Sequence, residues 1–272
     1  MNTHIDLLQA AVLALVQGLT EFLPISSSAH LALIPLLSPW PDQGLAFDCV
    51  VHLGSLTAVL LYFRHDVRLM SNGFLRTLSE RQWENNPDGR MAWFVLLATI
   101  PVGVVGLAFK DFIEHDLRSV LVIGCASMGF GLLLWWADRY SEHRRNDRDW
   151  SLRHALYVGL AQALALIPGT SRSGATMTMA LMLGYSREAA ARFSFLLSIP
   201  VIVLAGGLKI KDWIESPDQA AGLGPLLLGY VLSAVSAWLC IHFFLKFIER
   251  MGMAPFVLYR MILGAVLIWL AF

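Results

Sequence analysis

Charged residues are scarce in this sequence of 272 residues: they make up 15% of the chain, against roughly 25% in typical soluble domains. Hydrophobic residues make up 57%, and the mean hydropathy is +0.61. A soluble domain of this size has too little interior to bury so much apolar surface. The composition therefore excludes a water-soluble enzyme, and it excludes disordered and fibrous proteins for the same reason.

An excess of charge of either sign is also lacking. Lysine and arginine number 20, aspartate and glutamate number 20, and the isoelectric point is about 7.1. This balance provides no basic surface for nucleic acid, so we expect no nucleic-acid partner. The three cysteines, Cys49, Cys125 and Cys240, are scattered through apolar runs. An odd and widely spaced set predicts buried thiols and neither a disulfide framework nor a zinc site.

Long apolar runs separate the clusters of charge. Each comes close to the roughly 20 residues that an α-helix needs to cross about 30 Å of hydrocarbon. The sequence therefore predicts an all-α polytopic membrane protein. Its six transmembrane helices are expected at residues 46–63, 91–109, 119–137, 193–208, 223–245 and 253–272.

Two pairs of shorter apolar segments remain, and a proline breaks each pair. Residues 7–23 are followed by Pro24 and then by residues 28–37, whereas residues 153–167 are followed by Pro168 and then by residues 174–184. A helix of about 10 residues is only about 15 Å long and cannot cross a bilayer. Short apolar helices around a polar break predict two re-entrant hairpins.

The two hairpins resemble one another in sequence. Gln17-Gly-Leu-Thr-Glu-Phe-Leu-Pro-Ile-Ser-Ser-Ser-Ala29 parallels Gln162-Ala-Leu-Ala-Leu-Ile-Pro-Gly-Thr-Ser-Arg-Ser-Gly-Ala175. One hairpin and three spans per half give an odd number of crossings, so the second half would be inverted relative to the first. Inverted repeats gather polar groups near the bilayer midplane. We predict one integral membrane domain over residues 1–272, with repeats over about 5–137 and about 153–272.

Fourteen of the 20 lysine and arginine residues fall on one predicted face, chiefly in loops at about 64–90 and 138–153. The positive-inside rule places this face in the cytoplasm and both termini outside. The first residues of the chain have neither a basic stretch nor a small-residue cleavage site. We therefore expect no cleaved signal peptide.

Charged side chains within the apolar hairpins are candidates for function, because each costs at least about 2.5–3.5 kcal/mol to insert. Glu21 lies in the first hairpin and Arg172 in the second. Gln17 and Glu21 are four residues apart, on one face of a helix. Their oxygens suit a divalent cation, Mg²⁺ or alternatively Ca²⁺. The alternative role for Glu21 is a purely structural ion pair with Arg172.

Two further polar positions lie in predicted spans. Asp48 and His52 are four residues apart in the first span, and Asp48 is a possible additional metal ligand. Arg260 follows Tyr259 in the last span, with no motif around it. For Arg260 we expect a structural pairing or a side chain that reaches toward the membrane surface.

The serine cluster Ser26, Ser27 and Ser28 follows Pro24, at the expected start of a helix. Serine is a favoured N-cap residue, but capping requires only one of the three. His30 is three residues after Ser27 and so lies on the same side of the first turn. A hydroxyl beside an imidazole suggests an activated nucleophile or a proton donor to a leaving oxygen. The alternative is that His30 is a satisfied core residue.

The break in the second hairpin combines glycines, hydroxyls and one arginine. Glycines allow a backbone to approach a ligand, the N–H groups at a helix start attract phosphate, and arginine offers a bidentate charged fork. Two such helix starts that meet from opposite sides would hold a diphosphate with a metal ion between them. Besides Arg172, the expected substrate-binding residues are Ser26, Ser28, Gly169, Thr170, Ser171, Ser173, Gly174 and Thr176.

At these residues the chain resembles the undecaprenyl-diphosphate phosphatase family of bacterial integral membrane proteins. The resemblance rests on Gln17-x-x-x-Glu21, Glu21-Phe-Leu-Pro-Ile-Ser-Ser-Ser-Ala-His30, Pro168-Gly-Thr-Ser-Arg-Ser-Gly-Ala-Thr176 and Phe193-Ser-Phe-Leu-Leu-Ser-Ile-Pro200. Length and the order of spans agree over essentially the whole chain. Gln17 stands where the family also uses glutamate, and Ala29 stands where glycine is frequent.

The resemblance implies hydrolysis of undecaprenyl diphosphate to undecaprenyl phosphate and inorganic phosphate with a divalent cation. This reaction recycles the lipid carrier for peptidoglycan synthesis, on which cell shape depends, and is associated with bacitracin resistance. The resemblance also implies that Gln17 and Glu21 form the metal-associated motif, that Ser27 and His30 are the catalytic pair, and that Arg172 binds phosphate. It implies a bacterial inner membrane and an active site open to the periplasm.

The main alternative is an inverted-repeat transporter or flippase for an anionic isoprenoid lipid. A transporter needs a site that is reachable from both faces, but it needs no nucleophile beside a base. The sequence leaves open the isoprenoid chain length, the choice between a phosphoserine intermediate and direct attack by water, and a possible homodimer.

Overall fold

The computed structural model describes residues 5–38, 40, 43–80, 85–215 and 222–272. Over these residues the chain is helical, with one isolated β-bridge between Arg145 and Tyr185 and no strand in the same ranges. The all-α prediction is confirmed. The first-half helices are α1 (Leu7–Phe22), α2 (Ser27–Leu37), α3 (Gly44–Tyr62), α4 (Arg64–Ser79), α5 (Pro87–Ala108), α6 (Lys110–His115) and α7 (Val120–Tyr140). The second half contains α8 (Leu152–Leu164), α9 (Arg172–Met182), α10 (Arg187–Glu215), α11 (Leu223–Met251) and α12 (Ala254–Leu270), after a short 3-10 turn at Asp147–Asp149.

Five of the described helices are long and apolar enough to cross a membrane: α3, α5, α7, α10 and α11. The sixth predicted span forms α12, a helix of 17 residues that is shorter than these five. Apolar side chains also face outward. On α5, Leu96, Ile100, Val104 and Leu107 are 42% to 64% exposed at a spacing of three to four residues. A continuous apolar outer face of this kind suits lipid, and the chain is a multi-pass membrane protein.

The predicted cytoplasmic loop at about 64–90 contains a helix that the sequence did not predict. Most of this region forms α4, which packs against α5. Only Gly73 is buried among the described residues of α4, and a Cβ there would lie 2.5 Å from the backbone nitrogen of Gly89. The mostly polar sequence concealed this helix, because a narrow contact with one neighbour requires few apolar residues.

The hairpin helices begin and end within about three residues of the predicted bounds. Asp6 caps α1 in a capping box with Gln9, with hydrogen bonds of 2.8 and 3.0 Å. The helix ends at Phe22 because Leu23 precedes Pro24, and a residue before proline is driven to extended backbone. In the second hairpin, α8 ends at Leu164, shortly before Pro168.

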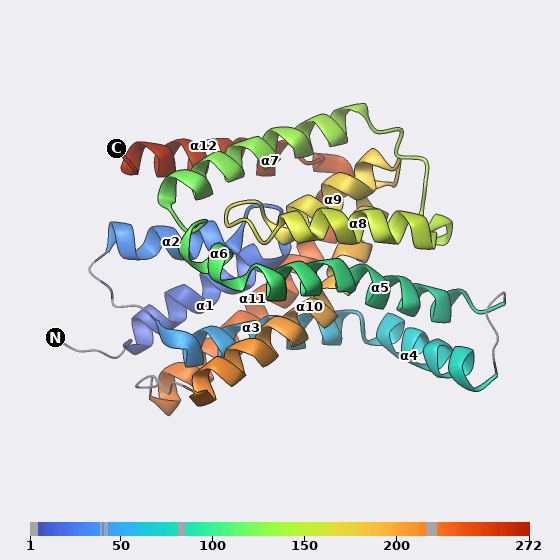
Figure 1. Cartoon of the computed structure of the whole chain (residues 1–272), viewed down its shortest axis with the longest axis horizontal. Helices are drawn as coiled ribbons and strands as arrows, with labels where there is room; N and C mark the ends of the chain where they lie inside the picture. Colours follow the sequence, from blue (N-terminus) through green and yellow to red (C-terminus); the bar gives the residue numbers. More distant parts are fainter. Residues whose placement is uncertain (1–4, 39, 41–42, 81–84, 216–221) are drawn as a thin grey trace.

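The packing of the two halves follows one pattern. Helix α1 packs against α11, and α8 packs against α5; α3 packs against α10, and α7 packs against α12. Figure 1 shows both termini at one end of the molecule, with α4 and the connection from α7 to α8 at the opposite end. The breaks of both hairpins therefore lie between the two ends, in the middle of the bundle.

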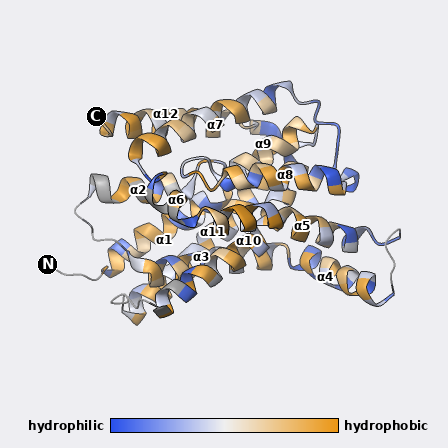
Figure 2. Cartoon of the chain, viewed as in Figure 1, coloured by the Kyte–Doolittle hydropathy of each residue, from blue (hydrophilic) through white to orange (hydrophobic). Residues whose placement is uncertain are grey.

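Ion pairs hold together the end of the molecule opposite to the termini. Arg192 at the start of α10 binds Asp66 of α4 at 2.7 Å and Asp147 of the α7–α8 connection at 2.8 Å. Arg187 binds Asp138 at the end of α7 at 2.6 Å. Figure 2 shows hydrophilic residues gathered along the α7–α8 connection and hydrophobic residues along the spans. The segments predicted to share the cationic face therefore do share one end.

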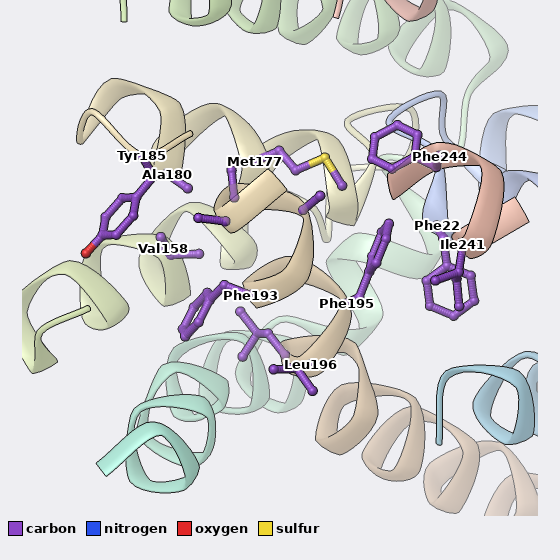
Figure 3. Close-up of a cluster of buried hydrophobic side chains, with 14 of the residues drawn as sticks. Phe22, Val158, Met177, Ala180, Tyr185, Phe193, Phe195, Leu196, Ile241 and Phe244 are labelled. Atoms are coloured by element: carbon purple, nitrogen blue, oxygen red, sulfur yellow. The ribbon is translucent and has the colours of Figure 1, made fainter. Parts of the chain in front are cut away.

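The largest hydrophobic core lies around α10 and supports the hairpins. Phe195 of α10 meets Phe22 of α1 edge to face, with ring centroids 5.4 Å apart. Near the end of the molecule opposite to the termini, which carries most of the lysine and arginine and is called the cationic end below, Trp150 stacks against Tyr185 and Phe193. The centroid distances are 3.8 and 3.9 Å. Figure 3 shows part of this cluster, including Phe195 and Phe22. The core therefore fixes the end of α1 against α10, which places the first hairpin.

Candidate active site

The two hairpin helices α2 and α9 begin with the same unusual backbone. Ser26 and Ser171 have φ angles of 71° and 72°, a left-handed region that residues other than glycine rarely adopt. Each side chain caps its own helix: Ser26 Oγ accepts from the N–H of Ala29 at 3.4 Å, and Ser171 Oγ accepts from the N–H of Gly174 at 3.2 Å. Such strained positions concentrate at functional sites.

The structure brings Glu21 and Arg172 into contact. Arg172 Nη2 lies 3.3 Å from Glu21 Oε1 and 3.4 Å from the Glu21 carbonyl oxygen, and Nη1 donates to the carbonyl of Ser194 at 3.2 Å. The Arg172 and Glu21 side chains are 13% and 9% exposed. This ion pair joins the end of α1 to the start of α9, so the charged residues of the two hairpins share one site.

The other carboxylate oxygen of Glu21 accepts two hydrogen bonds from its own hairpin. Ser27 Oγ donates to Glu21 Oε2 at 3.2 Å, and Gln17 Nε2 donates to the same oxygen at 2.9 Å. Gln17 is fully buried, and its Oε1 has no hydrogen-bond partner. The Ser27 hydroxyl is therefore hydrogen-bonded to the Glu21 carboxylate, and the buried amide oxygen of Gln17 is available to a ligand.

His30 does not pair with Ser27 in this structure. Its Nδ1 lies 2.7 Å from the carbonyl oxygen of Ser26, and its Nε2 lies 2.6 Å from the hydroxyl of Tyr259 on α12. The spacing of three residues does place His30 and Ser27 in the same turn of helix. The hydroxyl that binds the imidazole, however, belongs to Tyr259 of α12 and not to Ser27. Sequence reasoning missed Tyr259, which has no motif around it.

The hydroxyls of the second hairpin bind mainly to protein groups. Ser173 donates to the carbonyl of Leu23 in the first hairpin at 2.8 Å and lies 3.2 Å from Ser171 Oγ. Thr176 Oγ1 lies 2.7 Å from Ser194 Oγ on α10. These contacts hold the two breaks and α10 together. The hydroxyls that the sequence assigned to substrate binding are therefore used here to connect the hairpins to one another and to α10.

The remaining predicted substrate residues lie on the same two breaks. Gly169 has a φ of 94°, and a Cβ there would overlap the carbonyl oxygen of Ile123. Thr170 is buried with its Oγ1 unpaired, and Gly174 lies in the first turn of α9. The side chain of Ser28 lies outside the described part of the structure.

Asp48 lies beside a lysine and not in the group around Glu21. Lys209 Nζ on α10 is 2.8 Å from Asp48 Oδ2, and Gln43 Nε2 donates to Oδ1 at 3.1 Å. His52 Nδ1 is 2.7 Å from the Asp48 carbonyl oxygen. The possible role of Asp48 as a metal ligand gains no support from this pairing, because Lys209 already neutralises the carboxylate.

Arg260 lies at the site, where the sequence motifs did not place it. It is completely buried, and its guanidinium donates to backbone carbonyls at both hairpin breaks. From the sequence we expected either a structural pairing or a side chain that reaches toward the membrane surface. A lone arginine in an apolar span indicated an unusual position, but the sequence around it did not indicate which backbone segments it would bind.

The residues around Glu21 are compatible with a hard cation. No group of three His, Cys, Asp or Glu side chains that could bind a metal is found in the described ranges. A hard cation such as Mg²⁺ needs only one or two carboxylates and takes its other ligands from water or substrate phosphate. Glu21 provides the carboxylate, and the unpaired Oε1 of Gln17 provides a second oxygen.

Comparison with known proteins identifies the same family over the length of the chain. The model of the bacitracin resistance protein BacA family matches residues 10–266. The chain is 59% identical over 266 residues to Undecaprenyl-diphosphatase 2 of Stutzerimonas stutzeri strain A1501, with 97% of each chain covered.

Two other relatives are named Undecaprenyl-diphosphatase. That of Thioalkalivibrio sulfidiphilus strain HL-EbGR7 is 53% identical, and that of Nitrosococcus oceani strain ATCC 19707 is 51% identical. In both comparisons 97% of this chain and 99% of the relative are covered. With relatives this similar over nearly its whole length, the chain belongs to the bacitracin resistance protein BacA family.

Proposed function

We propose that this protein hydrolyses undecaprenyl diphosphate to undecaprenyl phosphate and inorganic phosphate. The observation that carries the proposal is the meeting of the hairpins, where Arg172 and Ser27 bind opposite oxygens of the Glu21 carboxylate. The names of relatives that are 51% to 59% identical support the same reaction. As a family member, the protein would recycle the lipid carrier for cell-wall synthesis and contribute to bacitracin resistance.

In the proposed reaction, the Ser27 hydroxyl attacks the terminal phosphorus. Ser27 already donates to Glu21 Oε2, so Glu21 accepts the proton as the bond from Ser27 Oγ to phosphorus forms. The bond from phosphorus to the bridging oxygen breaks, and undecaprenyl phosphate leaves. Water then hydrolyses the phosphoserine and releases inorganic phosphate. In the alternative, a water molecule held by Ser27 and His30 attacks the terminal phosphorus directly.

Arg172 acts as the anion receptor in this proposal. In the absence of substrate its only ion-pair partner among the described residues is Glu21. A diphosphate would compete for its guanidinium and bind in bidentate fashion. Stabilisation of charge in the transition state is the largest contribution expected.

A divalent cation would be held by Glu21 and Gln17, with Mg²⁺ as the first choice and Ca²⁺ as the second. The buried, unpaired Oε1 of Gln17 supports this assignment. When bound, the cation would supply charge neutralisation for the diphosphate. The further ligands would be phosphate oxygens and water.

We also propose that the two halves are an inverted repeat with six spans and two re-entrant hairpins. Equivalent helix pairs, α1 with α11 and α8 with α5, support this arrangement, as do the matching φ angles of Ser26 and Ser171. At 17 residues, α12 lies at the lower limit for a span. The cationic end would face the cytoplasm of a bacterial inner membrane, with the active site open to the periplasm. The homodimer stays a prediction.

Phosphate release by purified protein in detergent tests the proposal. We expect release from undecaprenyl diphosphate that a chelator stops, and we expect Arg172→Ala and Glu21→Gln variants to be folded but inactive. Parental activity in either variant would contradict the site assignment. A labelled phosphoserine at Ser27 after acid quench would establish the covalent route. A protein that only transports the lipid would release no phosphate, because transport breaks no bond between phosphorus and oxygen.

A further inference from the structure

His30 is held in one orientation by groups on two sides. The carbonyl oxygen of Ser26, 2.7 Å from Nδ1, can only accept a hydrogen bond, so Nδ1 carries a proton. In the neutral ring Nε2 is therefore the acceptor, and the Tyr259 hydroxyl donates to it at 2.6 Å. The two rings are also nearly parallel, with an interplanar angle of 6° and centroids 5.4 Å apart. The Ser26 carbonyl therefore sets the tautomer, and Tyr259 donates to the Nε2 that this leaves unprotonated and orients the plane of the imidazole.

The next residue, Arg260, connects three separate segments of backbone. Its Nε donates to the carbonyl of Ser127 on α7 at 3.0 Å, and Nη1 donates to the carbonyl of Pro24 at 3.3 Å. Its Nη2 donates to the carbonyls of Gly169 and Thr170 at 3.0 and 2.8 Å. One guanidinium therefore binds the breaks of both hairpins.

No carboxylate forms an ion pair with Arg260 among the residues described. A cation without a counter-charge is costly in a membrane interior. The four carbonyl contacts pair four of its five N–H donors, but they leave its positive charge in place. A shorter apolar residue would avoid this cost if the position required only packing. The charge and the fixed fork geometry therefore serve a purpose beyond filling space.

The carbonyl contacts also orient the N–H groups at the start of α9. A trans peptide unit directs its C=O and its N–H in opposite directions. Because the carbonyl of Thr170 points at Arg260, the N–H of Ser171 points away from it. Backbone N–H groups at a helix start are the donors that bind phosphate. Arg260 thus sets the direction of a donor at the expected phosphate site.

We propose that Tyr259 and Arg260 of α12 are positioning residues of the active site, with Tyr259 fixing His30 and Arg260 fixing both hairpin breaks. This inference rests on the proposed diphosphate hydrolysis as the reaction that they serve. It assigns a role to α12, which provides none of the residues predicted from the sequence motifs. Among the described residues, the hydrogen-bond partners of the His30 imidazole are the Ser26 carbonyl and the Tyr259 hydroxyl.

The first test is Tyr259→Phe, which removes one oxygen from a side chain that is 43% exposed and so should leave the fold intact. With histidine labelled by ¹⁵N and its His30 signals assigned with a His30→Gln variant, we expect a protonated Nδ1 and an unprotonated Nε2 in the parent. In the variant Nδ1 should stay protonated, because the Ser26 carbonyl remains, but the Nε2 signal should shift because this nitrogen loses its hydrogen bond. We further expect kcat to fall about tenfold, as for loss of one hydrogen bond, with a changed pH profile and KM within about twofold.

Tyr230→Phe is the matched control, because Tyr230 on α11 also donates or accepts one hydroxyl hydrogen bond, to Thr57 at 2.8 Å, away from His30. It should leave the His30 signals and the pH profile unchanged. The second test is Arg260→Lys, which keeps the charge but loses the planar fork. We expect KM for a prenyl diphosphate, and the inhibition constant of inorganic phosphate, to rise at least about tenfold.

Two results would overturn the inference. One is a Tyr259→Phe protein with the parental His30 Nε2 signal and pH profile, and the other is an Arg260→Lys protein that binds phosphate as the parent does. A parent that releases no phosphate would instead refute the proposed function. The ¹⁵N signals of His30 would still decide the role of Tyr259 in that case, because they do not depend on turnover.

Discussion

Removal of the Arg172 guanidinium should destabilise the fold as well as abolish activity. Its partner Glu21 is only 9% exposed and would remain as a buried, uncompensated carboxylate. Loss of one partner of a buried ion pair typically costs about 3–5 kcal/mol. We therefore expect Arg172→Met to lower the free energy of unfolding by about that amount. The hydrogen bonds that Glu21 keeps from Gln17 and Ser27 favour the lower end of the range.

A double-mutant cycle isolates the pair from other effects of the substitution. In Arg172→Met combined with Glu21→Gln no buried charge remains at these positions, so the double variant should be less destabilised than the sum of the singles. We expect an interaction energy of about 1–3 kcal/mol. Equilibrium unfolding in mixed detergent and SDS micelles, followed by tryptophan fluorescence, measures the four proteins.

The control for this cycle is an exposed pair. The side chains of Arg144 and Glu142 are 81% and 70% exposed, with 3.7 Å between Nη1 and Oε2. Arg144→Met should cost less than about 1 kcal/mol, because water screens such pairs. If Arg172→Met costs no more than Arg144→Met, or if the two site substitutions are additive, then Glu21 and Arg172 are not coupled in the folded protein.

Three further outcomes are expected. Gly159→Ala should destabilise the protein by about 1–3 kcal/mol through overpacking, because a Cβ at this position would overlap the carbonyl of Ala98. Gly103 has open space around it, so Gly103→Ala is the control and should leave the thermal unfolding temperature unchanged. Equal effects of the two substitutions would refute the packing of α8 on α5. Asp48→Asn should leave the cation dependence of phosphate release unchanged, since its carboxylate pairs with Lys209; a large shift in the required Mg²⁺ concentration would instead identify a metal ligand. Chelation should stop turnover, and added Mg²⁺ should restore it; full activity in excess chelator would refute the proposed cation.

The elements of the fold could be predicted from the sequence because their signals are local. The length of an apolar run and a proline at its end are enough to predict the helices of both hairpins and of α3, α5, α7, α10, α11 and α12. The polar helix α4 was missed, since its sequence carries little of the apolar signal on which the prediction depends. The cost of charge in lipid was likewise enough to single out Glu21 and Arg172.

What the sequence determined by itself is therefore the set of apolar helices, the family and the two charged residues at the hairpins. Only the tertiary structure decided which groups meet, because hydrogen-bond partners in the bundle come from helices far apart along the chain. His30 and Tyr259 are separated by 229 positions, and Ser27 binds Glu21 and not the nearby histidine. For the same reason the role of Arg260 could not be predicted from the sequence. Its guanidinium binds backbone carbonyls, which every residue has, so the residue types of its partners do not reveal the contact.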